Sequence, residues 1–316
     1  MPFLSHLHTL KLENQNLHAS FSSSYDPILT VQSGDTIVVT TPDIAFGFAE
    51  EKGMERVQFH SREKETAWGH PMIGPIKVEE ARQGMTLEIT LHDIETGWYG
   101  WNCAGGKTNW QNEVLGISKM DEVRLDWHLD AERMIGTTNV GEQPISVVLK
   151  PFMGLLGVAP SEPGIHSTIP PRRVGGNIDC KELVSGSTLY LPIEVDGALF
   201  SIGDGHAIQG DGEVSGQAIE CPMNAVTFTL KVREDVLIKS PRANTPSGWL
   251  TFGFHEDLNE ATALALQGMI ELIQEQYKVS KTEATALASV VVDLRITQVV
   301  NQVKGVHALL PHGAIR

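Results

Sequence analysis

Glycine and proline interrupt the first 250 residues so often that only short strands fit between them. The chain has 30 glycines and 16 prolines, and the segments between them are rich in β-branched residues and alternate polar with apolar side chains. Short strands at roughly ten-residue spacing, separated by turn residues, are typical of a β-sandwich or a barrel. The first expected strands lie at 28–31, 36–40, 85–91, 123–129 and 145–149.

A second β-rich part follows, with strands expected near 188–193, 198–203, 213–220 and 226–232. We therefore predict a mainly β fold with soft boundaries. An N-terminal β-sandwich part covers 1–150, a β-rich part covers 151–245, and a small α+β segment covers 246–316. The three parts could also form one integrated domain.

The spacing of apolar residues changes after Trp249, from the alternation of strands to the spacing of a helix. Apolar residues recur at helical spacing through 259–278, which predicts a helix with one face in the core. Ser280 and Glu283 match a capping box, so a second helix should cover 281–291. Residues 294–300 could finish that helix or form a strand.

Charge and composition exclude several classes of protein. With 24 Lys+Arg against 39 Asp+Glu, the net charge is −15, which repels phosphate backbones and makes a nucleic-acid partner unexpected. Apolar runs fall far short of the ~20 residues of a membrane-spanning helix, so no membrane partner is expected. The first residues lack the basic start and apolar core of a signal peptide, and the three scattered cysteines form no disulfide framework. A cytoplasmic protein is the expectation.

The densest polar segment is GDGHAIQGDGE at 203–213. Asp204 and His206 are two residues apart, so on an extended chain they project from the same face and could both ligate a metal such as zinc. The alternative is a glycine-rich turn whose polar side chains only cap backbone groups.

A second polar segment is GGNIDCK at 175–181. Asn177, Asp179 and Lys181 alternate and would share a face if extended, so Asp179 could be a further ligand and Lys181 could polarise a carbonyl. The alternative is a surface Asp–Lys pair of little energetic value. Cys180 would point the other way as a small buried hydrophobic residue, with a nucleophilic role as a minor alternative.

Glu79 lies at the end of a short apolar stretch, just before a turn. It is either a solvated turn residue or a carboxylate directed into a cleft as a general base. The nearby His70 is expected to be a surface or hydrogen-bonded histidine.

Taken together, these segments resemble the acetamidase/formamidase family. The similarity keeps its order over about residues 26–310. The segments that carry it are GPIKVE at 74–79, PFMGLLGVAP at 151–160, GGNIDCK at 175–181, GDGHAIQGDGE at 203–213 and DLRITQVV at 293–300.

The resemblance implies a jelly-roll-like β-sandwich, a homo-oligomer, and hydrolysis of short amides to a carboxylic acid and ammonia. Some members resemble this chain yet open cyclic amides, with a divalent metal such as zinc in the site. Glu79, Asp179, Asp204 and His206 occupy the matching motif positions.

The first functional hypothesis is therefore a metal-assisted amidohydrolase acting on a small amide. Asp179, Asp204 and His206 would bind the ion, with zinc favoured and calcium as the second choice. Glu79 would be the general base and Lys181 would stabilise the developing oxyanion. We expect the side chains of Glu79, Asp179, Asp204 and His206 to converge in one site.

The second hypothesis is a non-catalytic β-sandwich module that binds calcium or sugars. Asp204, Asp211 and Glu213 would then be structural calcium ligands in an open acidic loop. An enclosed pocket that groups His206 with Glu79 would favour the enzyme.

Overall fold

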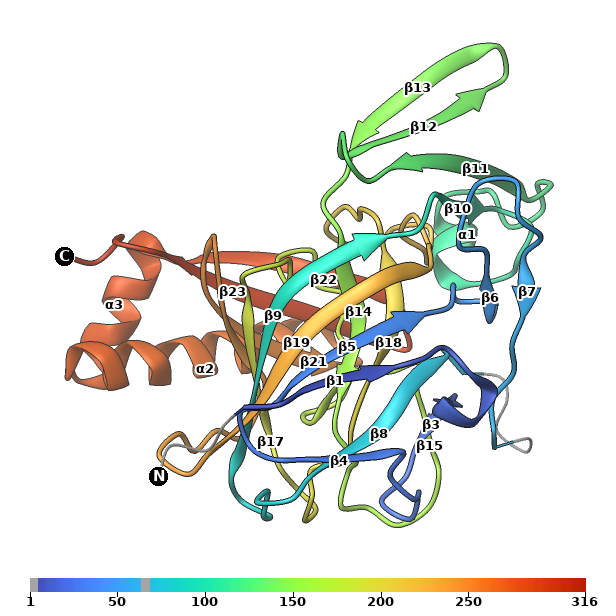
Figure 1. Ribbon diagram of the computed structural model, residues 1–316. Helices are drawn as coiled ribbons and strands as arrows, with labels where there is room; N and C mark the ends of the chain where they lie inside the picture. Colours follow the sequence, from blue (N-terminus) through green and yellow to red (C-terminus); the bar gives the residue numbers. More distant parts are fainter. Residues whose placement is uncertain (1–4, 64–68) are drawn as a thin grey trace.

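The computed structural model describes residues 5–63 and 69–316, and its largest element is a nine-stranded sheet (Figure 1). The predicted parts 1–150, 151–245 and 246–316 each contribute strands to this sheet. In sheet order the strands are β1 (Leu7–Leu10), β5 (Thr36–Thr41), β19 (Met223–Arg233), β9 (Thr86–Thr96), β17 (Thr188–Pro192), β20 (Arg242–Thr245), β21 (Gly248–His255), β23 (Val303–Pro311) and β22 (Asp293–Asn301).

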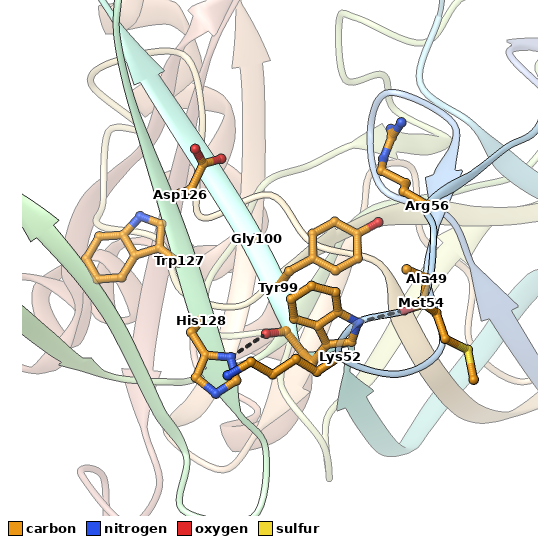
Figure 2. A pocket seen from close by; sticks show the side chains of 10 residues that line it. Ala49, Lys52, Met54, Arg56, Tyr99, Gly100, Asp126, Trp127 and His128 are labelled. Atoms are coloured by element: carbon orange, nitrogen blue, oxygen red, sulfur yellow. Dashed lines mark hydrogen bonds between the residues drawn. The ribbon is translucent and has the colours of Figure 1, made fainter.

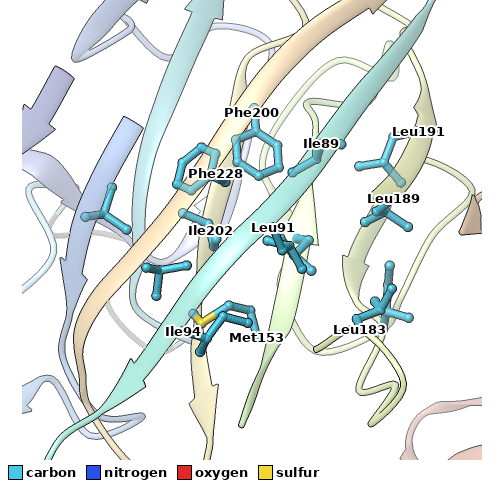
Figure 3. Close-up of a cluster of buried hydrophobic side chains, with 14 of the residues drawn as sticks. Ile89, Leu91, Ile94, Met153, Leu183, Leu189, Leu191, Phe200, Ile202 and Phe228 are labelled. Carbon is cyan, nitrogen blue, oxygen red and sulfur yellow. The ribbon is translucent and has the colours of Figure 1, made fainter. Parts of the chain in front are cut away.

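A second sheet packs against the first and shares its hydrophobic core. The ring centroids of Phe200 in one sheet and Phe228 in the other are 5.5 Å apart, and both side chains are fully buried (Figure 3). The strands of this second sheet, in sheet order, are β16 (Gly175–Asn177), β14 (Phe152–Gly157), β18 (Phe200–His206), β8 (Met72–Val78) and β2 (Leu17–His18), with β4 (Leu29–Val31) parallel to β8.

The strand β18 explains how polar groups enter the interior. All seven of its residues are buried, because β14 and β8 pair with it on both sides. Phe200 and Ile202 near its start fill the core between the sheets, whereas its last residues include Asp204 and His206. The strand therefore carries two ionisable groups into a region that excludes water.

Smaller elements surround the two sheets. In Figure 1 the hairpin of β12 and β13 extends away from the body of the molecule. The hairpin belongs to a four-stranded sheet of β10 (Tyr99–Ala104), β11 (Val123–Asp130), β12 (Ile135–Val140) and β13 (Gln143–Val148). Two further pairs of short strands are β3 (Ser20–Phe21) with β15 (His166–Ser167) and β6 (Gly47–Phe48) with β7 (Val57–Gln58). The short helices are η1 (Asn14–Asn16) and α1 (Trp110–Val114).

The predicted C-terminal helices are confirmed as α2 (Leu258–Tyr277) and α3 (Lys281–Val291). Ser280 and Glu283 form the expected capping box. The buried face of α2 packs on β21 and β23. Residues 294–300 lie in the strand β22, which resolves the choice between helix and strand.

The mainly β prediction is confirmed, but the expected strand at 213–220 is wrong. This segment is irregular and contains only isolated bridges. Gly212, Glu213 and Gly216 have φ angles of 96°, 48° and 85°, and these left-handed conformations are incompatible with a continuous strand. No helix among the described residues is long and apolar enough to cross a membrane.

Candidate active site

Four carboxylates and one histidine converge in the interior near the end of β18. Asp204 and His206 end β18, Asp179 follows β16, and Glu213 and Glu220 come from the irregular segment before β19. None of the five residues is more than 6% exposed. We call these five residues the carboxylate–histidine cluster.

His206 is at the centre of the cluster. Its Nε2 lies 3.3 Å from Asp204 Oδ1 and 3.2 Å from Glu220 Oε2. Ligand atoms of Asp179, His206 and Glu213 lie within 4.8 Å of one another, and so do those of Asp204, His206 and Glu220. The cluster thus consists of two donor triads that share one imidazole.

Both triads contain buried polar atoms without a hydrogen-bond partner among the described residues. Asp204 Oδ1 and Glu220 Oε2 still form ion pairs with His206 Nε2, so the triad of Asp179, His206 and Glu213 is the less satisfied of the two. Asp179 Oδ1, His206 Nδ1 and Glu213 Oε2 are buried and have no hydrogen-bond partner in the part of the chain that the structure describes. A buried polar atom without a partner costs about 1–3 kcal/mol, so such atoms are rare unless they serve a ligand. The donor set of this triad, two carboxylates and an imidazole, fits a divalent cation such as zinc.

The electrostatics of the cluster also favour a bound cation. Burial raises the pKa of Asp179 and of Glu213 well above the ordinary values, and the neighbouring carboxylates raise both further. Burial likewise raises the pKa of Glu220 to about 7, although His206 opposes this shift. The carboxylates therefore resist ionising together, and a divalent cation would supply the missing positive charge.

Asp204 and His206 differ from the other three residues, because the shifts of their pKa values favour the charged form of each. Burial by itself would raise the pKa of Asp204, but the charge of His206 and its hydrogen bond lower that pKa to about 2. Burial acts to lower the pKa of His206, whereas Glu220 and Asp204 raise it well above its usual value. Asp204 is thus the carboxylate of the cluster that stays ionised beside the imidazole.

The backbone around the cluster adopts unusual conformations. Asp179, Asp204 and Glu213 have φ angles of 51°, 60° and 48°, in the left-handed region that few residues other than glycine adopt. Such conformations are energetically costly and concentrate at functional sites. Here they turn three carboxylates toward the same point.

Gly154 in β14 leaves the space that these side chains fill. A Cβ atom at this position would lie 2.6 Å from Asp179 Oδ1, 2.7 Å from Asp204 Oδ2 and 2.8 Å from His206 Cε1. The position therefore tolerates only glycine while the cluster keeps its geometry.

Two amides hold Asp179 in place. Asn301 Nδ2 donates to Asp179 Oδ2 at 2.5 Å, and Gln209 Nε2 donates to the Asp179 carbonyl oxygen at 2.8 Å. Asn301 belongs to β22, so the C-terminal part of the chain helps to build the site.

The structure places the predicted ligands Asp179, Asp204 and His206 together, but the expected convergence of Glu79 with them is wrong. Glu79 is exposed and its side chain accepts a hydrogen bond from Gln32. It follows the C-terminal end of β8, whereas the N-terminal end of β8 pairs with Gly203, beside the cluster. The length of the strand therefore separates Glu79 from the site.

Lys181 is also placed differently from the expectation. The predicted alternation of Asn177, Asp179 and Lys181 fails, because β16 ends at Asn177 and Asp179 adopts a left-handed conformation. The Lys181 Nζ forms an ion pair with Asp211 at 2.9 Å. Asp211 is engaged there, outside the cluster, so the open calcium loop of the second hypothesis does not form.

Cys180 is a fully buried member of the hydrophobic core, as predicted. Burial raises the pKa of its thiol to about 12, so the thiolate is scarce at neutral pH.

Glu220 escaped the sequence reasoning, and Glu213 was considered only as a calcium ligand. Glu220 lies in the segment AIECPM at 218–223, where it is the lone charged residue among apolar ones. A carboxylate in such a run is unusual unless it is paired. The single charge in this apolar segment is the sequence feature that could have identified Glu220 as a site residue.

Two cavities have walls built from sequence neighbours of the cluster or of the residues that hold it, although no cluster residue lines either of them. One of about 220 Å³ is lined by Ser215, Gly216, Gln217 and Val300, which are close in sequence to Glu213 and Asn301. Another of about 420 Å³ has Trp98, Tyr99 and Trp127 in its walls (Figure 2). The backbone of Gly100 separates the latter from Glu220, since a Cβ at Gly100 would lie 2.7 Å from the Glu220 carbonyl oxygen.

His70 is half-buried, and its ring Nδ1 lies 2.9 Å from Thr168 Oγ1, in agreement with a hydrogen-bonded histidine. Burial lowers its pKa, and Asp204 opposes this shift.

Comparison with known proteins places this site in a family context. The sequence model of the Acetamidase/Formamidase family matches residues 162–313, which include the whole cluster. An acetamidase of Mycolicibacterium smegmatis is 50% identical over 110 residues, which are 32% of this chain and 27% of that protein. The aligned segments span 40% or less of the length of the curated relatives that the chain matches.

Solved structures are similar over nearly the whole chain. An acetamidase from Bacillus halodurans has a TM-score of 0.80 at 28% identity, covering 96% of this chain and 97% of that one. A predicted acetamidase/formamidase from Thermoanaerobacter tengcongensis has a TM-score of 0.81 at 28% identity, covering 97% and 96%. The resemblance that the sequence motifs indicated is thereby confirmed.

Proposed function

We propose that this relative of the acetamidases and formamidases hydrolyses short linear amides to a carboxylic acid and ammonia. The observation that carries the proposal is the carboxylate–histidine cluster, in which buried ionisable groups from distant parts of the sequence meet. Groups with shifted pKa values that converge in one buried place are typical of catalytic sites. The names of the relatives indicate which reaction such a site serves in this fold.

A divalent ion, with zinc favoured over calcium, forms part of the proposal. Asp179, His206 and Glu213 would hold it through the atoms that lack partners. When bound, such an ion polarises an amide carbonyl and lowers the pKa of a water toward about 7. Asp204 and Glu220 contact the other ring nitrogen of His206, which fixes the orientation of the imidazole.

Glu220 replaces Glu79 as the candidate general base. Its pKa of about 7 allows it to accept a proton from water and return one to the leaving nitrogen near neutral pH. A carboxylate with the ordinary pKa would accept that proton less readily. Glu79 is exposed and lies outside the carboxylate–histidine cluster, so it is not placed to act as this base.

The size of a cavity whose wall includes Ser215, Gly216 and Val300 favours a small substrate. Its volume of about 220 Å³ is smaller than that of typical drug-sized pockets. Formamide and acetamide are the substrates that we expect to fit best.

We extend the proposal to a cytoplasmic homo-oligomer. The three cysteines, Cys103, Cys180 and Cys221, are all free, which agrees with a reducing compartment. Exposed apolar side chains on the projecting hairpin, among them Val140, Ile145 and Val148, are compatible with subunit contacts.

The test combines metal analysis with ammonia release from formamide, acetamide and the larger benzamide. We expect about one divalent ion per chain and turnover of the two small amides. His206→Ala should lose both the ion and the activity, whereas His60→Ala, at an exposed histidine, should keep both. Full metal occupancy without ammonia release from any amide would contradict the enzyme and favour a binding module.

A further inference from the structure

A separate cavity of about 410 Å³ lies between α2, β21 and the turn that precedes β16. Its volume falls in the range of small-molecule sites. None of the cluster residues lines it. The walls include Arg172 and Arg173 from the turn, Lys239 from the loop before β20, Phe252 and Phe254 from β21, and Leu264 and Glu271 from α2.

The cavity carries positive charge that this acidic protein leaves largely uncompensated. Arg173 is paired with Glu194 at 2.8 Å, but no ion pair involves Arg172 or Lys239 among the described residues. Glu271, the carboxylate that the described residues contribute to the wall, accepts a hydrogen bond from Gln267 instead. Two free cations against one carboxylate leave a net charge of about +1, in a chain whose net charge is −15.

Arg172 carries a buried donor that has no partner in the described part of the chain. Its Nε is buried and has no partner within the described residues, and its Nη2 reaches only the Ser167 carbonyl oxygen at 3.5 Å. A guanidinium has five donors in a planar fork that matches the two oxygens of a carboxylate. The structure thus leaves an unused carboxylate-binding group at the edge of the cavity.

The remaining wall is apolar and aromatic. The rings of Phe252 and Phe254 stack with centroids 6.1 Å apart, and Leu264 of α2 is 44% exposed. Such a surface gains free energy when an apolar group covers it. A ligand for this cavity therefore needs both an anionic end and an apolar body.

We propose that this cavity binds a small monocarboxylate with a short apolar tail. The carboxylate pairs with Arg172 and Lys239, and the tail covers Phe254 and Leu264. Glu271 and the net negative charge of the protein oppose a dianion, so one negative charge is preferred. The site is independent of the amidase function proposed above.

The first experiment measures binding of hexanoate by isothermal titration calorimetry, with hexan-1-ol and hexylammonium as neutral and cationic counterparts. We expect hexanoate to bind at least about tenfold more tightly than either, because only the carboxylate can form charge-assisted hydrogen bonds with the two cations. His206→Ala should bind hexanoate as the unmodified protein does. Equal binding of the alcohol, or loss of binding in His206→Ala, would overturn the proposal.

The second experiment locates the site. Lys239→Gln and Leu264→Trp alter exposed positions, so both variants should fold, and Arg172→Gln removes the guanidinium itself. We expect each to weaken hexanoate binding about tenfold or more, whereas Arg133→Gln, which removes the same charge at an exposed turn, should have no effect. Unchanged binding in both Lys239→Gln and Leu264→Trp would show that hexanoate binds elsewhere.

Discussion

Glu220 illustrates how the surroundings of one carboxyl group decide its chemistry. It is 1% exposed and shares His206 with Asp204, and burial raises its pKa to about 7. Glu79 is the same residue type on the surface, where its side chain contacts Gln32. The two glutamates therefore offer a matched pair for mutagenesis.

We expect Glu220→Gln to lower amide turnover by about 10²–10⁴-fold, because the amide cannot accept a proton. Glu79→Gln makes the same chemical change and should leave turnover nearly normal. Ammonia release and metal per chain, measured on both variants, check this. Comparable losses in the two variants would contradict the assignment of the base.

Cys180 provides a second test at the scale of one residue. Its thiol is fully buried in the core and burial raises its pKa to about 12. Cys180→Ala should therefore keep its amidase activity, while the free energy of unfolding falls by about 1–2 kcal/mol through lost packing. Denaturant titration and ammonia release give the two readouts, and an inactive but folded variant would favour a thiol mechanism.

At the scale of elements, the strand β14 matters most for the site. It lies between β16 and β18, so it joins the element before Asp179 to the element that carries Asp204 and His206. Asp179 N donates to the Gly154 carbonyl oxygen at 3.1 Å, which ties the loop after β16 to the strand. The absence of a side chain at Gly154 lets the three ionisable groups approach one another.

Gly154→Ala should therefore disrupt the cluster. The added methyl group would lie within 2.8 Å of three buried side chains, which must move apart. We expect metal content and turnover to fall at least about tenfold, as for other displaced ligands. Gly210→Ala is the control, since a Cβ at this nearby glycine meets no atom within 4 Å. Normal metal binding by Gly154→Ala would refute the proposed role of this strand.

At the scale of the whole molecule, the cluster couples metal binding to stability. In the metal-free protein, Glu220, Glu213, Asp179 and His206 all have pKa values above their unfolded values. Each such group contributes stability that is present below its unfolded pKa and is lost as pH rises through the folded pKa. A divalent cation should reverse this trend, because it binds the ionised carboxylates.

We therefore expect the melting temperature of chelator-treated protein, measured relative to that of chelator-treated Glu220→Gln, to fall as pH rises from 5 to 8. The reference is needed because burial lowers the pKa values of His18 and His307 to about 3 and about 4, which acts in the opposite sense in both proteins. For Glu220 the loss lies between the ordinary carboxyl pKa of 4.5 and about 7. Added zinc should restore the melting temperature at pH 8 more than at pH 5. Differential scanning calorimetry measures both effects, and a difference in melting temperature between the two chelated proteins that does not fall with pH would contradict the charge arrangement.

The local features of this protein could be predicted from its amino-acid sequence. Glycine and proline spacing indicated a mainly β fold, apolar periodicity and the Ser280–Glu283 capping box located the two helices, and dense polar motifs identified Asp179, Asp204 and His206. These features follow from residues that are close along the chain, where propensity and capping act. The apolar surroundings of Cys180 likewise indicated its burial.

Which distant groups meet could not be predicted in this way, because it depends on long-range packing. Glu79 is directed away from the cluster because the antiparallel pairing of β8 with β18 puts its end of the strand far from His206. Glu220 joins the cluster because its backbone pairs with that of Trp101 and of His206. The pairing of β8 with β18 and of Trp101 with Glu220 joins segments far apart in the sequence, so it is set by the packing of the whole sandwich and not by a local pattern.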